Sequence, residues 1–183
     1  MRDLHRRGFL LGSAALGLAG CAGAPPEPSE ARRPTTLVDA FRGASLGVGV
    51  FRAPIVGVER PFRARLDGMA RGDRFDVAED FTFDDGERQR LTWRFRRTGP
   101  STWEGKREDT VGVADVVESD GVVRLNYVAD IRSGDGVTRL AFSDLIYRRA
   151  DGVVINEGSV RRFGLPIGSV HFELRRIDPS ARR

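Results

Sequence analysis

The sequence has 183 residues, with 30 basic and 26 acidic side chains and a formal net charge of +4. Lys106 is its only lysine, and charges of both signs are mixed along the chain. This pattern is typical of an ordinary solvated surface and excludes a strongly basic nucleic-acid interface, so we expect no nucleic-acid partner. Cys21 is the only cysteine, which excludes an internal disulfide.

Residues 1–20 have the pattern of a bacterial signal peptide. Arg6 and Arg7 precede an apolar run over residues 9–20, which is shorter than the roughly 20 residues that a membrane-spanning helix needs. The arginine pair and the bulky apolar residues after it resemble a twin-arginine export signal. The general secretory route remains the alternative.

Cys21 ends the lipobox Leu18-Ala19-Gly20-Cys21, and we expect its sulfur to carry a diacylglycerol thioether. The alternative is a small residue buried in a helix. Cleavage before Cys21 frees an amine for a further acyl chain such as palmitate, and each buried methylene adds roughly 0.8 kcal/mol of membrane affinity. Residues 21–36, rich in Pro, Ala, Glu and Ser, are predicted to form a lipidated, flexible tether. We therefore expect a protein anchored at the periplasmic face of the cell envelope.

The residue after the lipidated cysteine bears on which membrane is occupied. Ala22 stands where many lipoproteins retained in the inner membrane carry aspartate. The sequence therefore favours the outer membrane over the inner membrane.

Residues 37–177 are predicted to form one domain of short antiparallel strands. Asp-Gly pairs, which favour tight hairpins because both residues tolerate positive φ, recur along it. They are Asp67-Gly68, Asp85-Gly86, Asp120-Gly121, Asp135-Gly136 and Asp151-Gly152. Between them apolar residues alternate with polar ones, as in Val123, Leu125, Tyr127, Ala129 and Ile131. One turn or two of helix is expected over residues 36–42, between a Thr36 cap and Gly43.

These features predict an all-β fold, an antiparallel up-and-down barrel of about 8–10 strands with at most one short helix. A sandwich is the alternative, but sequential hairpins favour the barrel because closure removes exposed strand edges. Residues 178–183 are predicted to form a disordered tail.

Alternation places two carboxylates on interior strand faces. Glu79 shares its face with phenylalanines and a valine, and Asp144 shares its face with Leu140 and Phe142. A carboxylate in an apolar interior must be paired or protonated, and Arg90 is the first candidate partner for Glu79. Two interpretations stay open: a buried salt-bridge network that fixes strand register, or a pocket with a few convergent polar groups.

The usual catalytic and metal-binding patterns are sparse. His171, between Val170 and Phe172, is predicted to lie on the surface of the last strand. With one histidine beyond the leader and no free thiol we expect no metal, no cofactor and no nucleophilic catalytic group. Residues 47–49, Gly-Val-Gly, are predicted to form a thin strand where backbones approach closely, and not a phosphate-binding loop.

An ordered set of motifs carries a family resemblance over residues 38–176. It comprises Glu79-x-Phe81, Arg90 with Trp93, Trp103-x-Gly105, Asp109, Asn126-Tyr127, Asp144, Asn156 and Arg162-Phe163-Gly164. This set resembles a proteobacterial lipoprotein family of unknown function, numbered thirty-eight thirty-three among such domains. The resemblance implies a lipocalin-like barrel and a gene neighbourhood of enzymes that modify membrane lipids and fatty acids.

The sequence favours a binding protein whose barrel holds a small apolar or amphipathic ligand, such as a lipid or fatty-acid derivative. The predicted ligand-binding residues are Glu79, Phe81, Arg90, Trp93, Trp103, Tyr127, Phe142, Asp144 and Asn156. One alternative is an enzyme acting on envelope lipids, with Glu79 or Asp144 as general acid or base. The other is a structural lipoprotein with a filled barrel.

Overall fold

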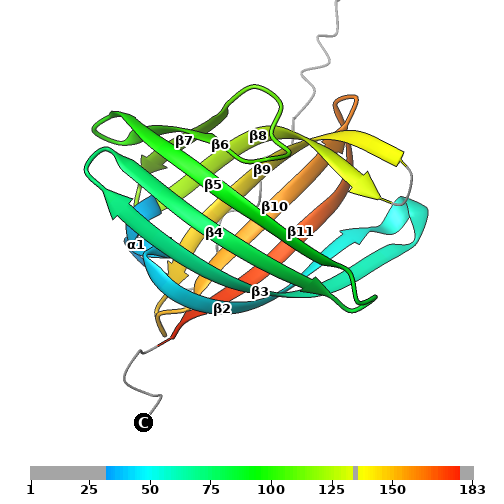
Figure 1. Ribbon diagram of the computed structural model, residues 1–183, viewed down its shortest axis with the longest axis horizontal. Coiled ribbons are helices and arrows are strands. Elements are labelled where there is room, and N and C mark those ends of the chain that lie inside the picture. Colours follow the sequence, from blue (N-terminus) through cyan, green and yellow to red (C-terminus); the bar gives the residue numbers. More distant parts are fainter. Residues whose placement is uncertain (1–31, 134–135, 178–183) are drawn as a thin grey trace, which may run out of the picture.

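Ten antiparallel strands close into a barrel in the computed structural model, which describes residues 32–133 and 136–177 (Figure 1). The ring consists of β2 (Gly43–Ala53), β3 (Val58–Arg71), β4 (Arg74–Phe83), β5 (Arg88–Gly99), β6 (Thr102–Lys106), β7 (Ala114–Ser119), β8 (Val122–Ser133), β9 (Gly136–Arg149), β10 (Val154–Arg162) and β11 (Leu165–Arg176). Each strand pairs with the next, and β11 returns to pair with β2. The predicted all-β, up-and-down barrel is confirmed.

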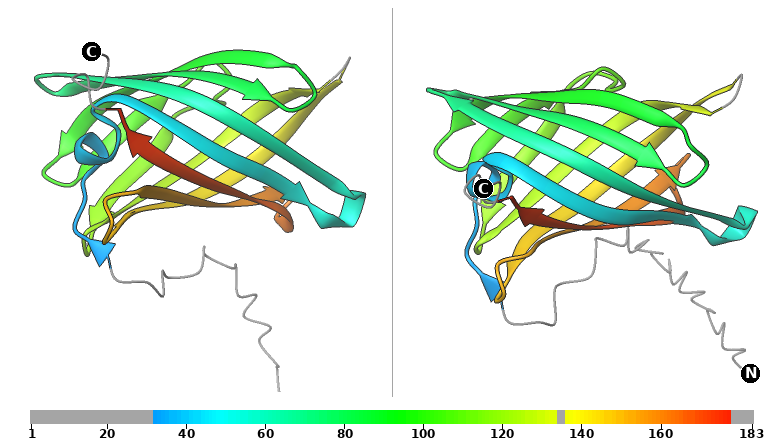
Figure 2. Two further views of the ribbon diagram at one scale, coloured as in Figure 1. Left: turned by 90° about the horizontal axis from the view of Figure 1, so that it is seen from below. Right: turned by 60° about the horizontal axis from the view of Figure 1, so that its bottom comes forward.

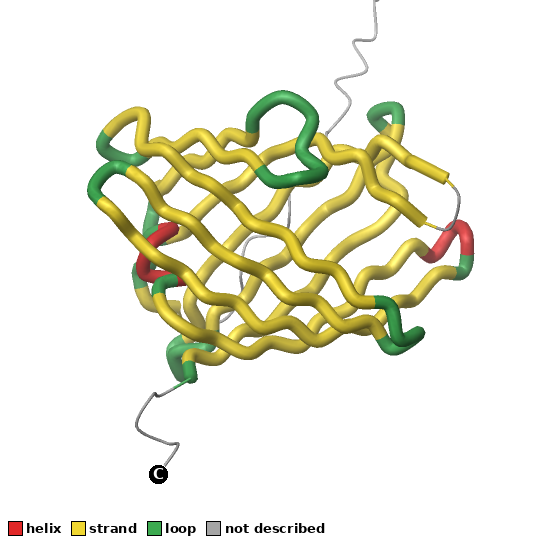
Figure 3. Tube along the Cα trace, viewed as in Figure 1, coloured by secondary structure: helices red, strands yellow, loops and turns green. Residues whose placement is uncertain are grey.

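Asp-Gly turns join four of the nine pairs of consecutive ring strands. Asp120 and Gly121 both adopt positive φ between β7 and β8, as the tightest hairpin turns require. The turns at residues 85–86 and 151–152 also carry their glycine at positive φ, and the turn at 135–136 lies partly outside the described residues. Figure 3 shows most of the loops at the two ends of the barrel, with one longer loop lying midway along its side.

One predicted turn is wrong. Asp67 and Gly68 lie inside β3, and the chain reverses instead at Gly72 and Asp73. Gly68 is required there for a different reason, because a Cβ at this position would collide with the backbone carbonyl of Phe41. A glycine in a strand can thus mark a close backbone approach as well as a turn.

A short helix covers one end of the barrel (Figure 2). This helix, α1 (Leu37–Phe41), begins after Thr36, whose Oγ1 accepts a hydrogen bond from the Asp39 backbone N–H at 3.1 Å. Leu37 and Ala40 are buried, so the helix fills the end of the barrel with apolar side chains. The helix predicted at residues 36–42 is confirmed.

Ordered contacts begin before residue 37. Strand β1 (Arg32–Arg33) pairs with the end of β9, and the Thr35 backbone N–H donates to the Gly121 carbonyl at 3.0 Å. Residues 32–36, predicted as part of the tether, therefore pack against the barrel. At the opposite end a single 3₁₀ turn, η1 (Pro54–Val56), joins β2 to β3.

Alternating residues fill the interior, as the period of two predicts. Phe75, Val77 and Glu79 of β4 all point inward and are buried. Gly47 and Gly49 of β2 leave room for the rings of Phe172 and Phe62, where an added Cβ would clash. The predicted thin strand over residues 47–49 is confirmed, and it lets large aromatic rings occupy the centre of the barrel.

Candidate functional site

A cavity of about 160 Å³ lies inside the barrel next to α1. Its walls are mainly aromatic and aliphatic, and they include Phe41, Phe62, Val77, Phe81, Trp93, Phe95, Val170 and Phe172. Five polar or ionisable side chains reach the same space: Glu79, Arg107, Tyr127, Asp144 and Asn156. A mostly apolar cavity with a few convergent polar groups is the usual form of a small-molecule site.

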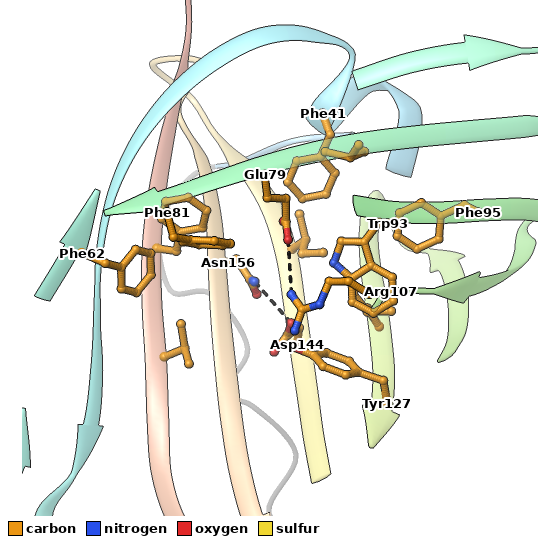
Figure 4. A pocket seen from close by; sticks show the side chains of 15 residues that line it. Phe41, Phe62, Glu79, Phe81, Trp93, Phe95, Arg107, Tyr127, Asp144 and Asn156 are labelled. Carbon is orange, nitrogen blue, oxygen red and sulfur yellow. Dashed lines mark hydrogen bonds and ion pairs between the residues drawn. The ribbon is translucent and has the colours of Figure 1, made fainter. Parts of the chain in front are cut away.

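Arg107 is the cationic centre of the cavity. Its Nε and Nη2 donate to the two carboxylate oxygens of Asp109 at 2.8 and 2.9 Å, and its Nη1 donates to Glu79 Oε2 at 3.2 Å. The side chains of Arg107, Glu79 and Asp109 are each only 10% exposed. Figure 4 shows the guanidinium between Glu79 and Asp144. The Trp93 ring lies 4.8 Å from the guanidinium carbon.

The loop between β6 and β7 holds Arg107 in place. The backbone N–H of Arg107 donates to Thr110 Oγ1 at 3.2 Å, and the backbone N–H of Thr110 donates to the Arg107 carbonyl at 3.1 Å. The Asp109 carbonyl accepts from the Asp130 N–H of β8 at 2.9 Å. The loop is thus fixed to the barrel wall, and the guanidinium is preorganised in the interior.

A second polar pair comes from adjacent strands. Asp144 of β9 accepts a hydrogen bond from Asn156 Nδ2 of β10 at 3.3 Å. Gly158 leaves the space beside Asp144 open, since a Cβ there would lie 2.6 Å from Asp144 Oδ1. Asn156 Oδ1 is buried without a hydrogen-bond partner among the described residues. The pair therefore presents an unused acceptor to the interior.

Burial shifts both cavity carboxyl groups. Desolvation raises the pKa of Glu79 from 4.5 to about 7, with the charges of Asp109 and Asp144 adding to the rise and Arg107 opposing it. Desolvation likewise raises the pKa of Asp144 from 3.8 to about 6, opposed by Asn156 and Arg107. Both groups therefore exchange protons close to neutral pH.

Six of the predicted ligand-binding residues line this cavity: Glu79, Phe81, Trp93, Tyr127, Asp144 and Asn156. Phe142 lies beside them, with its ring stacked on Tyr127 at a centroid distance of 4.8 Å. It lines a second cavity of about 120 Å³, and Phe62, Phe81 and Arg107 belong to the walls of both.

Two predicted residues lie elsewhere. Arg90 is on the outer face of β5, where it pairs with Asp80 at 2.6 Å and its side chain is 77% exposed, so the expected pairing with Glu79 is wrong. Side chains alternate between the two faces of a strand, so Arg90 points outward because its neighbour Leu91 points inward. Trp103 is buried, but its Nε1 donates to Glu118 Oε1 at 3.1 Å and it does not line the cavity.

Sequence reasoning missed Arg107 as the partner of Glu79. Alternation along strands could not find it, because Arg107 follows β6 in a loop and is not on a strand face. The available signal was the motif set, which contains Asp109, the residue that holds the guanidinium.

His171 is half-exposed between Glu157 and Glu173, as its predicted surface position requires.

The described residues bring together no group of three or more side chains arranged to hold a metal ion. Within residues 32–133 and 136–177, no helix has the length and apolar character needed to cross a membrane.

At least one solved structure has a similar architecture. The barrel is similar in fold to the S-type phycobiliprotein lyase CPES from Guillardia theta, with a TM-score of 0.54 and 9% identity, covering 75% of this chain and 88% of that chain. A de novo designed fluorescence-activating β-barrel has 14% identity and a TM-score of 0.35, covering 78% of this chain and 99% of that chain. No protein of curated function matches the sequence.

A family model described as "Protein of unknown function (DUF3833)" matches residues 15–176. This span includes the whole barrel and the loop that carries Arg107 and Asp109. The expected lipocalin-like barrel is present, and the chain belongs to the DUF3833 family.

Proposed function

We propose that this protein is a membrane-tethered lipoprotein whose barrel binds one small apolar or amphipathic ligand, a lipid or fatty-acid derivative, at the periplasmic face of the cell envelope. The observation that carries this proposal is the aromatic cavity with its polar groups gathered around Arg107. Small barrels either fill their interior with side chains or hold one small ligand. The unfilled space argues for the second arrangement and against a purely structural barrel.

The walls shared by two cavities support an elongated, partly apolar ligand. Phe62, Phe81 and Arg107 line both the main cavity and the smaller one lined by Phe142. An apolar chain that passes these side chains would occupy both spaces. The ionisable groups would then meet one end of the ligand, and the aromatic rings would contact the rest.

Filling the cavity should remove the ligand without unfolding the barrel. Val170 of β11 lines the cavity, so Val170→Phe places a ring in the space that the ligand needs. We expect the amount of small molecule that co-purifies from membranes, measured by mass spectrometry of an organic extract, to fall about tenfold or more, equivalent to at least about 1.4 kcal/mol of binding energy.

Val117→Phe is the matched control, because Val117 of β7 is 42% exposed on the outside of the barrel. It should leave the extracted molecule unchanged. Equal retention by both variants, with near-UV circular dichroism like that of the parent, would show that the cavity is not the binding site.

The proposed tether rests on Cys21, which lies outside the described residues. We expect Cys21→Ala to accumulate as an uncleaved precursor without a thioether-linked diacylglycerol. Intact-mass measurement of the protein extracted from membranes tests this directly. A Cys21→Ala protein that still carries diacylglycerol would contradict the proposed anchor.

The raised pKa of Glu79 favours a second candidate function, an enzyme acting on envelope lipids. A carboxyl group with a pKa of about 7 can donate or accept a proton at neutral pH. The residues that line the main cavity include no Ser, Thr, Cys, Lys or His, so such chemistry would rely on the carboxyl groups. Under this alternative, Glu79→Gln would retain the bound lipid but abolish its conversion.

A further inference from the structure

Among the described residues, the side chains around the two cavities carry more negative than positive groups. Three carboxyl groups, from Glu79, Asp109 and Asp144, surround the single guanidinium of Arg107. Arg107 stays protonated in proteins, so it offsets one of the three negative charges when all are ionised. Uncompensated charge in an apolar interior is costly, and the system lowers that cost by taking up a proton or by binding a cation.

The guanidinium already has its carboxylate partners. Asp109 occupies the Nε and Nη2 positions as a two-point pair, and Glu79 occupies Nη1. A ligand carboxylate would compete with both and would enter beside Asp144, which carries the same charge. The arrangement therefore opposes an anionic ligand although it contains an arginine.

Asn156 provides an independent indication. Its orientation follows from Asp144, because an amide must turn its NH₂ group, and not its oxygen, toward a carboxylate acceptor. This leaves the buried Asn156 Oδ1 as an acceptor without a donor among the described residues. An unpaired buried acceptor destabilises the folded protein, and a donating group on a ligand would remove that cost.

We propose that the polar end of the ligand is a primary ammonium group, which binds between Asp144 and Asn156 while its apolar part lies against the aromatic wall. This inference rests on the proposed ligand-binding function and specifies the ligand class. An ammonium carries N–H donors and a positive charge and no acceptor, so it meets the needs of both side chains. This proposal excludes a free fatty acid, whose polar end is a carboxylate, as the preferred ligand.

A homologous series of probes separates the head group from the chain. Octylamine, 1-octanol and octanoate have the same alkyl chain and differ in the charge and donors of one end. We expect isothermal titration of the full chain near pH 8 to give octylamine an affinity at least about tenfold higher than that of octanoate. 1-Octanol should lie between them. The preference for octylamine should shrink near pH 5, where Glu79 and Asp144 are protonated.

Asp144→Asn removes the negative charge but keeps the shape of the side chain. It should weaken octylamine binding about tenfold or more and leave 1-octanol binding nearly unchanged. Asp130→Asn is the matched control, since Asp130 pairs with Arg139 on the exposed surface. It should change neither affinity.

The outcomes distinguish the two proposals. Octanoate binding as tightly as octylamine near pH 8 would overturn the ammonium assignment while leaving the barrel a ligand-binding protein. Binding of none of the three probes would contradict the proposed function, and the ammonium assignment would fail with it.

Discussion

Replacing Arg107 with methionine should lower the free energy of unfolding by about 3–5 kcal/mol, the usual cost of breaking a buried ion pair by removing one partner. The guanidinium lies among the carboxyl groups of Glu79, Asp109 and Asp144 and offsets one of their charges. Without it, these carboxyl groups must be buried as anions or take up protons. The loss of stability should therefore grow as the pH rises.

Chemical denaturation of the Arg107→Met variant near pH 5 and pH 8 measures both the size and the pH dependence of this effect. Arg94→Met is the control, because Arg94 pairs with Glu108 at 2.9 Å with its side chain 59% exposed. Exposed pairs contribute at most about 1 kcal/mol. An Arg107→Met protein as stable as the control would show that the interior tolerates its carboxylates without the guanidinium.

Stability of the native protein should fall as the pH rises from about 4.5 to about 7 because of Glu79. The pKa of this group is about 7 in the folded protein and close to its ordinary value of 4.5 in the unfolded chain. Between these values the folded state binds more protons than the unfolded state, so raising the pH favours unfolding. A shift of this size corresponds to about 3 kcal/mol. Asp144 acts in the same direction from 3.8 to about 6.

Glu79→Gln isolates this contribution, because all other titrating groups remain. The parent protein should lose stability relative to Glu79→Gln between pH 5 and pH 8, as measured by urea denaturation at both values. The exposed Asp80, whose pKa is lowered by Arg90, provides the opposite control. Asp80→Asn retains Glu79, so the parent protein should show no such loss of stability relative to Asp80→Asn between pH 5 and pH 8. A constant difference between the parent and Glu79→Gln would mean that Glu79 does not titrate in this range.

The fold was predictable because its information is local. Period-two alternation and the Asp-Gly turns specify strands and hairpins within short segments of chain, and Asp120-Gly121 is a direct example. Alternation also predicted that Glu79 and Asp144 point inward, which their burial confirms. Asp67-Gly68 was wrongly predicted to be a turn. Gly68 is needed because the end of α1 lies against β3 there, and this contact cannot be seen in the local sequence since the whole of β2 separates α1 from β3.

The site was only partly predictable because its centre is not local. Arg107 belongs to a loop, and no repeat or spacing indicates which arginine, among many, turns its guanidinium into the interior. Trp103 shows the converse problem. It is buried as expected, but it binds Glu118, which also accepts the Leu37 backbone N–H at 2.9 Å, so it supports α1 instead of the cavity.

The pairing of β2 with β11 has a consequence for how the chain reaches its native state. All the remaining pairs of adjacent ring strands are consecutive in the chain, so each pair can form as soon as both of its strands are synthesised. The β2–β11 pair instead joins the first ring strand to the last. Closing so long a loop is slow, and until it occurs two strand edges stay open to other chains. A chain that ended before Leu165 would therefore leave β2 and β10 as unpaired strand edges.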